Sequence, residues 1–163
     1  MNPEKQNYND EPPILEQQES IKIEWGKVLS KFPDQLRQEF EIERPNPIQE
    51  DIEYFKSFHL LSPDPVSIPL VELLKSNEIN IFLCPPDIIE EINKKWGTKF
   101  DVSLSKVYDQ NPDRYRKYSL LSPETASPSV LVDGKIIFGV GRFIAALLRK
   151  DNDLQVWKLS TKQ

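Results

Sequence analysis

The sequence has very few of the residues that bind metals or form disulfides. Its 163 residues include one cysteine, Cys84, and one histidine, His59. A single cysteine cannot form an intrachain disulfide, and neither residue has the companions that a zinc site needs. Cys84 ends the apolar run 79–84, so we interpret it as a buried structural thiol. We therefore expect neither a metal centre nor thiol chemistry.

Glycine, long apolar runs and positive charge are also scarce. Five glycines stand against fourteen prolines, which predicts short elements joined by fixed turns. No apolar run approaches the ~20 residues that cross a bilayer, and residues 1–20 lack the basic start and apolar centre of a signal peptide. We expect a cytoplasmic protein that does not use a membrane. A net charge of −5 restricts nucleic-acid contact to a local basic face or a partner protein.

Composition and apolar spacing divide the chain into three parts. Residues 1–20 are rich in Asn, Gln, Glu and Pro, which predicts a disordered tail. Residues 21–62 are predicted to form a helical N-terminal extension, because apolar residues recur at helical spacing on both sides of Pro33 and again over 48–61. Residues 63–163 are predicted to form an α+β domain, in which helices pack on a small mixed sheet.

Several elements of that domain are expected from local patterns. Pro at a helix start and Gly at a helix end predict a helix from Pro85 to Trp96 that closes at Gly97. Other helices are expected over 69–75 and after Asn111. Short apolar or alternating runs predict strands over 66–70, 79–83, 100–104 and 154–159.

The most informative stretch covers residues 127–148. Residues 130–132 and 135–138 are rich in β-forming side chains, and Asp133-Gly134 between them is typical of a hairpin turn. Gly139 and Gly141 lead into a segment with helical apolar spacing. A glycine turn at a helix start exposes backbone N–H groups to an anion, and Arg142 adds a group suited to phosphate or carboxylate. Two interpretations stay open: an anion site, or a tight strand-to-helix turn with Arg142 on the surface.

This block resembles the ParB-like domain, a fold shared with sulfiredoxin. The family pattern is Pro, a strand, an acidic-Gly turn, a second strand and Gly-Glu-Arg-Arg-aromatic-x-Ala-Ala. The matching positions here are Pro128, Asp133-Gly134 and 139–146. The family's Glu is Val140 here, the first of its paired arginines is Gly141, and the sulfiredoxin Cys and His are missing. The resemblance implies a ParB-like fold with a phosphate pocket, and it argues against the catalysis of either branch.

Residues 114–118 are the one dense basic and aromatic cluster in the sequence. Such a cluster in a helix contacts a phosphate backbone or stacks on a base. The alternative is a solvated helix face with Tyr115 and Tyr118 packed beneath it.

Three functions remain as alternatives. The first is a non-catalytic ParB-like binding module in a DNA-associated complex, with a nucleoside triphosphate as the cofactor that the resemblance implies. Its ligand-binding residues would be Gly139, Val140, Gly141, Arg142 and Asp133, helped by Arg114 and Arg116. The second is a degenerate ParB-like subunit that only contacts a protein partner. The third is a nucleotide-hydrolysing or nuclease enzyme, with Asp133 or Glu124 as its nearest carboxylate. We expect binding to a protein partner rather than catalysis.

Overall fold

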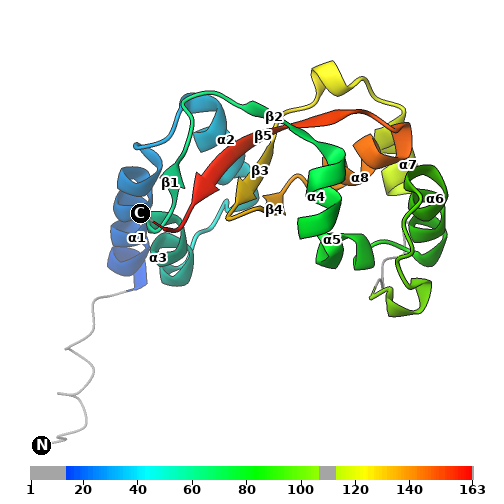
Figure 1. Ribbon diagram of the computed structural model, residues 1–163. Helices are drawn as coiled ribbons and strands as arrows, with labels where there is room; N and C mark the ends of the chain where they lie inside the picture. Colours follow the sequence, from blue (N-terminus) through cyan, green and yellow to red (C-terminus); the bar gives the residue numbers. More distant parts are fainter. Residues whose placement is uncertain (1–13, 107–112, 163) are drawn as a thin grey trace, which may run out of the picture. The chain divides into compact units, whose positions relative to one another are not determined.

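The computed structural model describes residues 14–106 and 113–162. These residues divide into two compact units, with the boundary between Phe58 and His59 (Figure 1). The sequence pattern placed the boundary slightly later, at the Ser62-Pro63 step. None of the described helices combines the length and the apolar composition needed to cross a bilayer.

The described part of the first unit consists of three helices packed around aromatic rings. These are α1 (Ile14–Leu29), α2 (Asp34–Glu43) and α3 (Gln49–Lys56). Phe40 is fully buried, and its ring meets Phe32 and Phe55 edge-on at centroid distances of 5.1 and 4.8 Å. Edge-to-face pairs of this kind stabilise a core beyond the burial of their area.

The start of α1 contradicts a disordered tail that reaches Ser20. The helix begins at Ile14, and residues 1–13 lie outside the described residues. Trp25 and Val28 are buried and hold the second half of the helix in place. Once a helix is nucleated, each added residue gains a backbone hydrogen bond, so residues 15–19, which are good helix formers, extend it towards the N-terminus.

The second unit contains a five-stranded mixed sheet. Its strands are β1 (His59–Leu60), β2 (Val66–Pro69), β3 (Ser129–Val132), β4 (Lys135–Phe138) and β5 (Asp153–Ser160). The order is β1-β5-β3-β4, and β2 pairs with β5 as well. β3 and β5 are parallel, whereas the other pairs are antiparallel. Figure 1 shows β5, in red, running between β2 and β3. This sheet and its helices confirm the α+β fold class.

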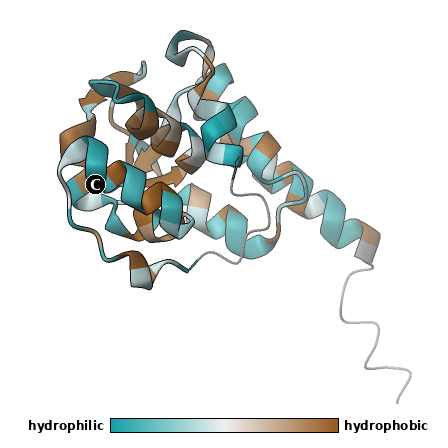
Figure 2. Ribbon diagram, turned by 90° about the vertical axis from the view of Figure 1, so that its right-hand side faces the viewer, coloured by the Kyte–Doolittle hydropathy of each residue, from teal (hydrophilic) through white to brown (hydrophobic). Residues whose placement is uncertain are grey.

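Helices cover the sheet and carry most of the core of the second unit. They are α4 (Leu70–Ser76), α5 (Glu78–Phe82), α6 (Pro86–Trp96), α7 (Arg114–Ser119) and α8 (Val140–Arg149). α8 packs against both α6 and α7. Phe143, Ile144 and Leu147 of α8 are fully buried. Figure 2 shows apolar and polar residues alternating around the helices, as amphipathic helices require.

Two predicted strands and one helix end are wrong. Residues 79–83 lie mostly in α5, because a short apolar run has no periodicity that separates strand from helix. Residues 100–104 contain a 3-10 turn, η2 (Val102–Leu104). The Asp101 carboxylate accepts a hydrogen bond from the Ser103 amide and so competes with strand pairing. The helix expected over 48–61 ends at Lys56, and His59 lies in β1.

Asn77 connects α4 and α5 to β4. Its side chain is 2% exposed and donates from Nδ2 to the carbonyl oxygens of Leu73 and Gly134 at 3.0 and 3.1 Å. Its Oδ1 accepts hydrogen bonds from the Ile136 amide at 2.8 Å and from Asn80 Nδ2 at 2.9 Å. One buried amide therefore joins two helices to the hairpin.

Replacing Asn77 with alanine should destabilise the second unit by about 2–4 kcal/mol, because buried partners lose their hydrogen bonds. Urea unfolding monitored by circular dichroism measures the change. The exposed Asn152, whose backbone but not side chain has a described contact, provides the control Asn152→Ala. Equal effects of the two substitutions would contradict this role of Asn77.

Candidate functional site

The hairpin expected before α8 is present. β3 and β4 are joined by Asp133 and Gly134, whose φ angles are +51° and +84°. Positive φ at both central residues is the geometry of a type I′ turn. The hairpin returns the chain to Gly139, with φ +82°, and α8 begins at the next residue. The predicted strand, turn and helix are therefore confirmed.

Gly139 lies where no side chain fits. A Cβ atom there would stand 2.6 Å from Ser129 Oγ and 2.9 Å from Arg142 Cζ. The Ser129 hydroxyl donates to the Gly139 carbonyl at 3.0 Å, so the backbone of β3 lies directly against the turn. Both the left-handed φ and this close approach require glycine.

Arg142 binds backbone of its own chain. Its Nη1 donates to the carbonyl oxygens of Ser127 and Pro128, at 2.6 Å each. The guanidinium therefore lies over Gly139 and ties the segment before β3 to the first turn of α8. The Tyr118 ring lies over Gly141, 3.2 Å from the position of a Cβ there. Two side chains thus cover part of the helix start that the anion hypothesis requires to be open.

Asp133 stabilises the other end of the hairpin. Its Oδ1 accepts hydrogen bonds from Ser160 Oγ at 3.0 Å and from the Thr161 amide at 3.1 Å, and Oδ2 accepts one from Thr161 Oγ1. The bonds from Thr161, and then that from Ser160, lower the pKa of Asp133, as does the charge of Lys162. β4 separates this carboxylate from Gly139, so Asp133 belongs to the sheet end and not to the helix start.

The arginines of α7 have partners elsewhere. Arg116 forms a double ion pair with Glu91 and Asp87 of α6. Burial opposes ionisation of Glu91, but hydrogen bonds from Arg116 and Lys95 outweigh it, and the pKa of Glu91 is lowered. Arg114 donates to the Tyr115 hydroxyl at 3.0 Å and lies over that ring.

The candidate residues therefore fall into three places. Gly139, Val140, Gly141 and Arg142 share the start of α8, Asp133 lies at the far end of β4, and Arg114 and Arg116 lie on α7. Glu124 lies in the 3-10 turn η3 (Pro123–Thr125). The assignment of a ligand to these residues stays a prediction.

Neither a reactive thiol nor a metal site is found among the other described residues. Burial raises the pKa of the Cys84 thiol to about 12, against the opposing charge of Arg114, which suppresses the reactive thiolate at neutral pH. The structural interpretation of Cys84 is confirmed. Within the described ranges, no group of three or more His, Cys, Asp or Glu side chains gathers in an arrangement that could hold a metal ion.

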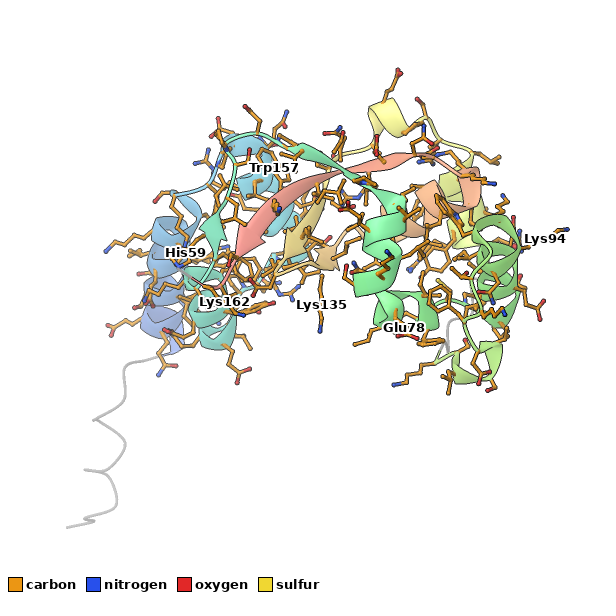
Figure 3. The ribbon with its side chains drawn as sticks, viewed as in Figure 1. His59, Glu78, Lys94, Lys135, Trp157 and Lys162 are labelled. Carbon is orange, nitrogen blue, oxygen red and sulfur yellow. The ribbon has the colours of Figure 1, made fainter. Side chains whose placement is uncertain are left out.

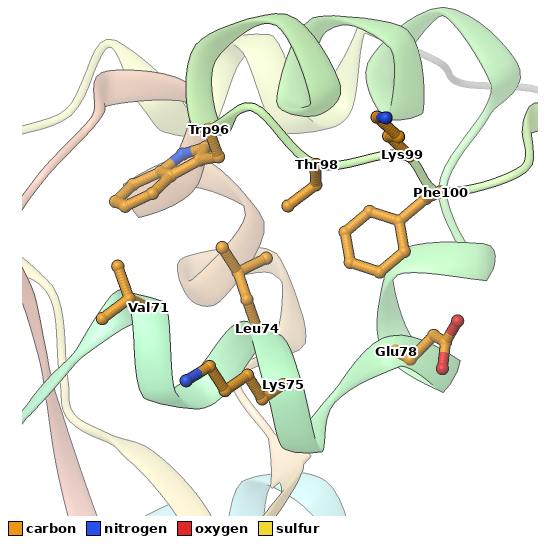
Figure 4. Close-up of a pocket in the computed structure, with 8 residues that line it drawn as sticks. All are labelled: Val71, Leu74, Lys75, Glu78, Trp96, Thr98, Lys99 and Phe100. Carbon is orange, nitrogen blue, oxygen red and sulfur yellow. The ribbon is translucent and has the colours of Figure 1, made fainter.

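Sequence reasoning missed a pocket between α4 and the end of α6. Its volume is about 550 Å³, and Figure 4 shows its lining. Trp96, at the end of α6, is only partly buried, and its side chain forms one wall of the pocket. The available signal was the succession of Trp96, a helix-ending Gly97 and Phe100, which places two aromatic rings on either side of a sharp change in direction.

The fold is thus an α+β domain preceded by a helical unit. Comparison of the chain with protein-family models, curated proteins and solved structures finds no match. The resemblance to the ParB-like domain therefore depends on the residues of the block 127–148 alone.

Replacing Gly139 with alanine should destabilise the fold more than the same change at Gly97. Both glycines have positive φ, but a Cβ at Gly97 meets nothing within 4 Å. Backbone strain costs ~1–2 kcal/mol at either site, and the contacts with Ser129 and Arg142 add ~1–3 kcal/mol at Gly139. Denaturant unfolding of both variants measures the difference. Equal costs would show that the close approach at Gly139 is not tight.

Asp133 should make the fold sensitive to acid. Because its folded pKa lies below its unfolded pKa, its stabilisation is present above the unfolded pKa and is lost as pH falls through the folded value. Asp133→Asn keeps a residue that tolerates positive φ and removes the charge. The stability difference between wild type and Asp133→Asn, measured by urea unfolding at several pH values, should shrink on acidification. A difference that is constant with pH would contradict the assignment.

Proposed function

We propose that the protein is a non-catalytic interaction subunit of ParB-like fold. Its contact surface is the α7 tip, which we define as Tyr118, Leu120 and Leu121. These three side chains are 43%, 86% and 58% exposed. Apolar side chains scattered singly on a surface are ordinary, whereas adjacent ones mark contact sites. This exposed group is the observation that carries the proposal.

Arg149 of α8 holds the backbone of the α7 tip in place. Arg149 donates from Nη1 to the carbonyl oxygens of Tyr118 and Leu121, at 3.2 and 3.1 Å. The same guanidinium pairs with the Asp151 carboxylate at 2.9 Å. A preorganised surface loses little conformational entropy on association. Because Arg149 already fixes the backbone of the α7 tip, binding through Leu120 and Leu121 requires little further ordering.

The polar groups that the sequence singled out support contact rather than chemistry. Arg142 binds backbone carbonyls, Arg116 pairs with α6, and Asp133 binds the end of β5 and Thr161. Lys117, next to the α7 tip, is exposed. The partner that fits is therefore a protein with an apolar groove and an acidic rim.

The test substitutes Leu120 and Leu121 with aspartate in one full-length variant. Proteins that co-purify with the tagged chain from its native host are first identified, and their affinities are then measured with purified components. Burying each leucine contributes about 1.5–2 kcal/mol, so the double variant should weaken binding about 100-fold or more.

The control is Leu104→Asp, at a position that is 51% exposed on η2. The control should bind as wild type does. Equal binding by all three proteins would overturn the proposal. Self-association of the wild type that the double variant abolishes, measured by analytical ultracentrifugation, would replace the partner with a second copy of this chain.

Phosphate binding at the start of α8 is the second candidate. One observation favours it: the N-cap residue of α8 is Gly139, which has no side chain to cap the helix and leads in a left-handed conformation directly into the first turn. Backbone N–H groups at such a start attract anions. Binding of CTP, ATP, GTP or inorganic phosphate to the folded state must raise the melting temperature, and Arg142→Ala should remove that rise. If no ligand raises the melting temperature, phosphate binding is excluded and the interaction subunit is the remaining proposal.

The expectation that the chain is not an enzyme stays a prediction, which a nucleotide-hydrolysis assay tests.

A further inference from the structure

The pocket between α4 and the end of α6 shares no residue with the α7 tip or the start of α8. Its wall on one side is the α4 face with Val71 and Leu74, and its wall on the other side holds Trp96 and Phe100 (Figure 4). Leu74 is buried, and Val71 remains 53% exposed at the mouth. An aliphatic and aromatic surface of this kind favours a hydrocarbon body.

Hydrogen bonds within the protein hold the two aromatic walls of the pocket in place. Trp96 Nε1 donates to the Leu147 carbonyl at 2.9 Å. The Asn93 side chain binds the Phe100 backbone twice: its Nδ2 donates to the Phe100 carbonyl oxygen at 2.9 Å, and its Oδ1 accepts from the Phe100 backbone N–H at 3.0 Å. The Thr98 hydroxyl donates to the same Oδ1 at 2.8 Å. The pocket is therefore formed before anything binds to it.

The rim of the pocket carries two cations and one anion. Lys75 and Lys99 lie on opposite sides of the opening, on α4 and on the segment after α6, and Glu78 lies at the start of α5 (Figure 4). Among the described residues, neither ammonium group has a hydrogen bond or an ion pair. Two positive groups and one negative group leave the rim with one net positive charge.

We propose that this pocket binds a small amphiphilic monoanion, namely a carboxylate with an aliphatic or aromatic body. The body packs between Leu74, Trp96 and Phe100, and the carboxylate pairs with Lys75 or Lys99. A volume of about 550 Å³ lies within the ~300–1,000 Å³ of small-molecule sites. Glu78 disfavours a second negative charge, so a monoanion fits better than a phosphate ester.

The probe is octanoate, titrated into the full-length protein. Amide and indole resonances of the protein are followed by two-dimensional NMR, and the Trp96 indole N–H and the Phe100 amide report on the two aromatic walls. Both resonances should shift saturably. Octanoate should bind about tenfold more tightly than 1-octanol, because only octanoate pairs with an ammonium group. No saturable shift at millimolar octanoate would overturn the proposal, and so would equal affinity for 1-octanol.

Charge variants locate the carboxylate. The double substitution Lys75→Glu with Lys99→Glu should weaken octanoate binding about tenfold or more. Lys94→Glu is the matched control, since Figure 3 shows Lys94 projecting from α6 away from the rest of the unit. Glu78→Gln removes the repelling charge and should strengthen binding by a few-fold. Weakening by Lys94→Glu equal to that of the double variant, or weakening by Glu78→Gln, would overturn the assignment. Unchanged melting temperatures show that each variant is folded.

Discussion

Burial of α8 is the constraint on which the second unit depends. Phe143, Ile144 and Leu147 are fully buried, and the helix contacts both α6 and α7. Its two ends then hold the neighbouring segments through polar contacts. Lys95 and Trp96 of α6 donate to the carbonyl oxygens of Leu148 and Leu147 in the last turn, where the regular backbone hydrogen bonds of a helix end.

The same helix explains why the candidate residues behave as they do. Arg142 at its start holds the approach to β3, and Arg149 at its end holds the α7 tip. An arginine that binds backbone carbonyls has fewer donors left for a ligand. The arrangement stabilises surfaces that other molecules can contact, and its polar groups serve the fold itself. The proposed contact through the α7 tip is consistent with that use of charge.

The sequence predicted the elements whose signals are local. The hairpin turn at Asp133-Gly134 and the end of α6 at Gly97 both require positive φ, which glycine permits without strain. The predictions failed for residues 79–83, where the pattern is short and distant contacts decide, and for residues 100–104, where the local hydrogen bond from the Ser103 amide to Asp101 replaces strand pairing. The α5 turn is stabilised by Asn80, which donates from Nδ2 to the Ile136 carbonyl of β4 at 3.2 Å. No local rule contains that contact, because its two residues are far apart in sequence.

The sequence by itself determined the α+β class, the inert Cys84 and the glycine turn into α8, because each follows from side-chain type or from backbone sterics within a few residues. Tertiary structure alone decided where the charged groups point. It paired Asp133 with Thr161, directed Arg116 to Glu91, and placed Trp96 opposite α4. The physical reason is that an ion pair or a pocket depends on which surfaces meet. The packing of the whole unit decides which surfaces meet, and the periodicity of the sequence contains no information about that packing.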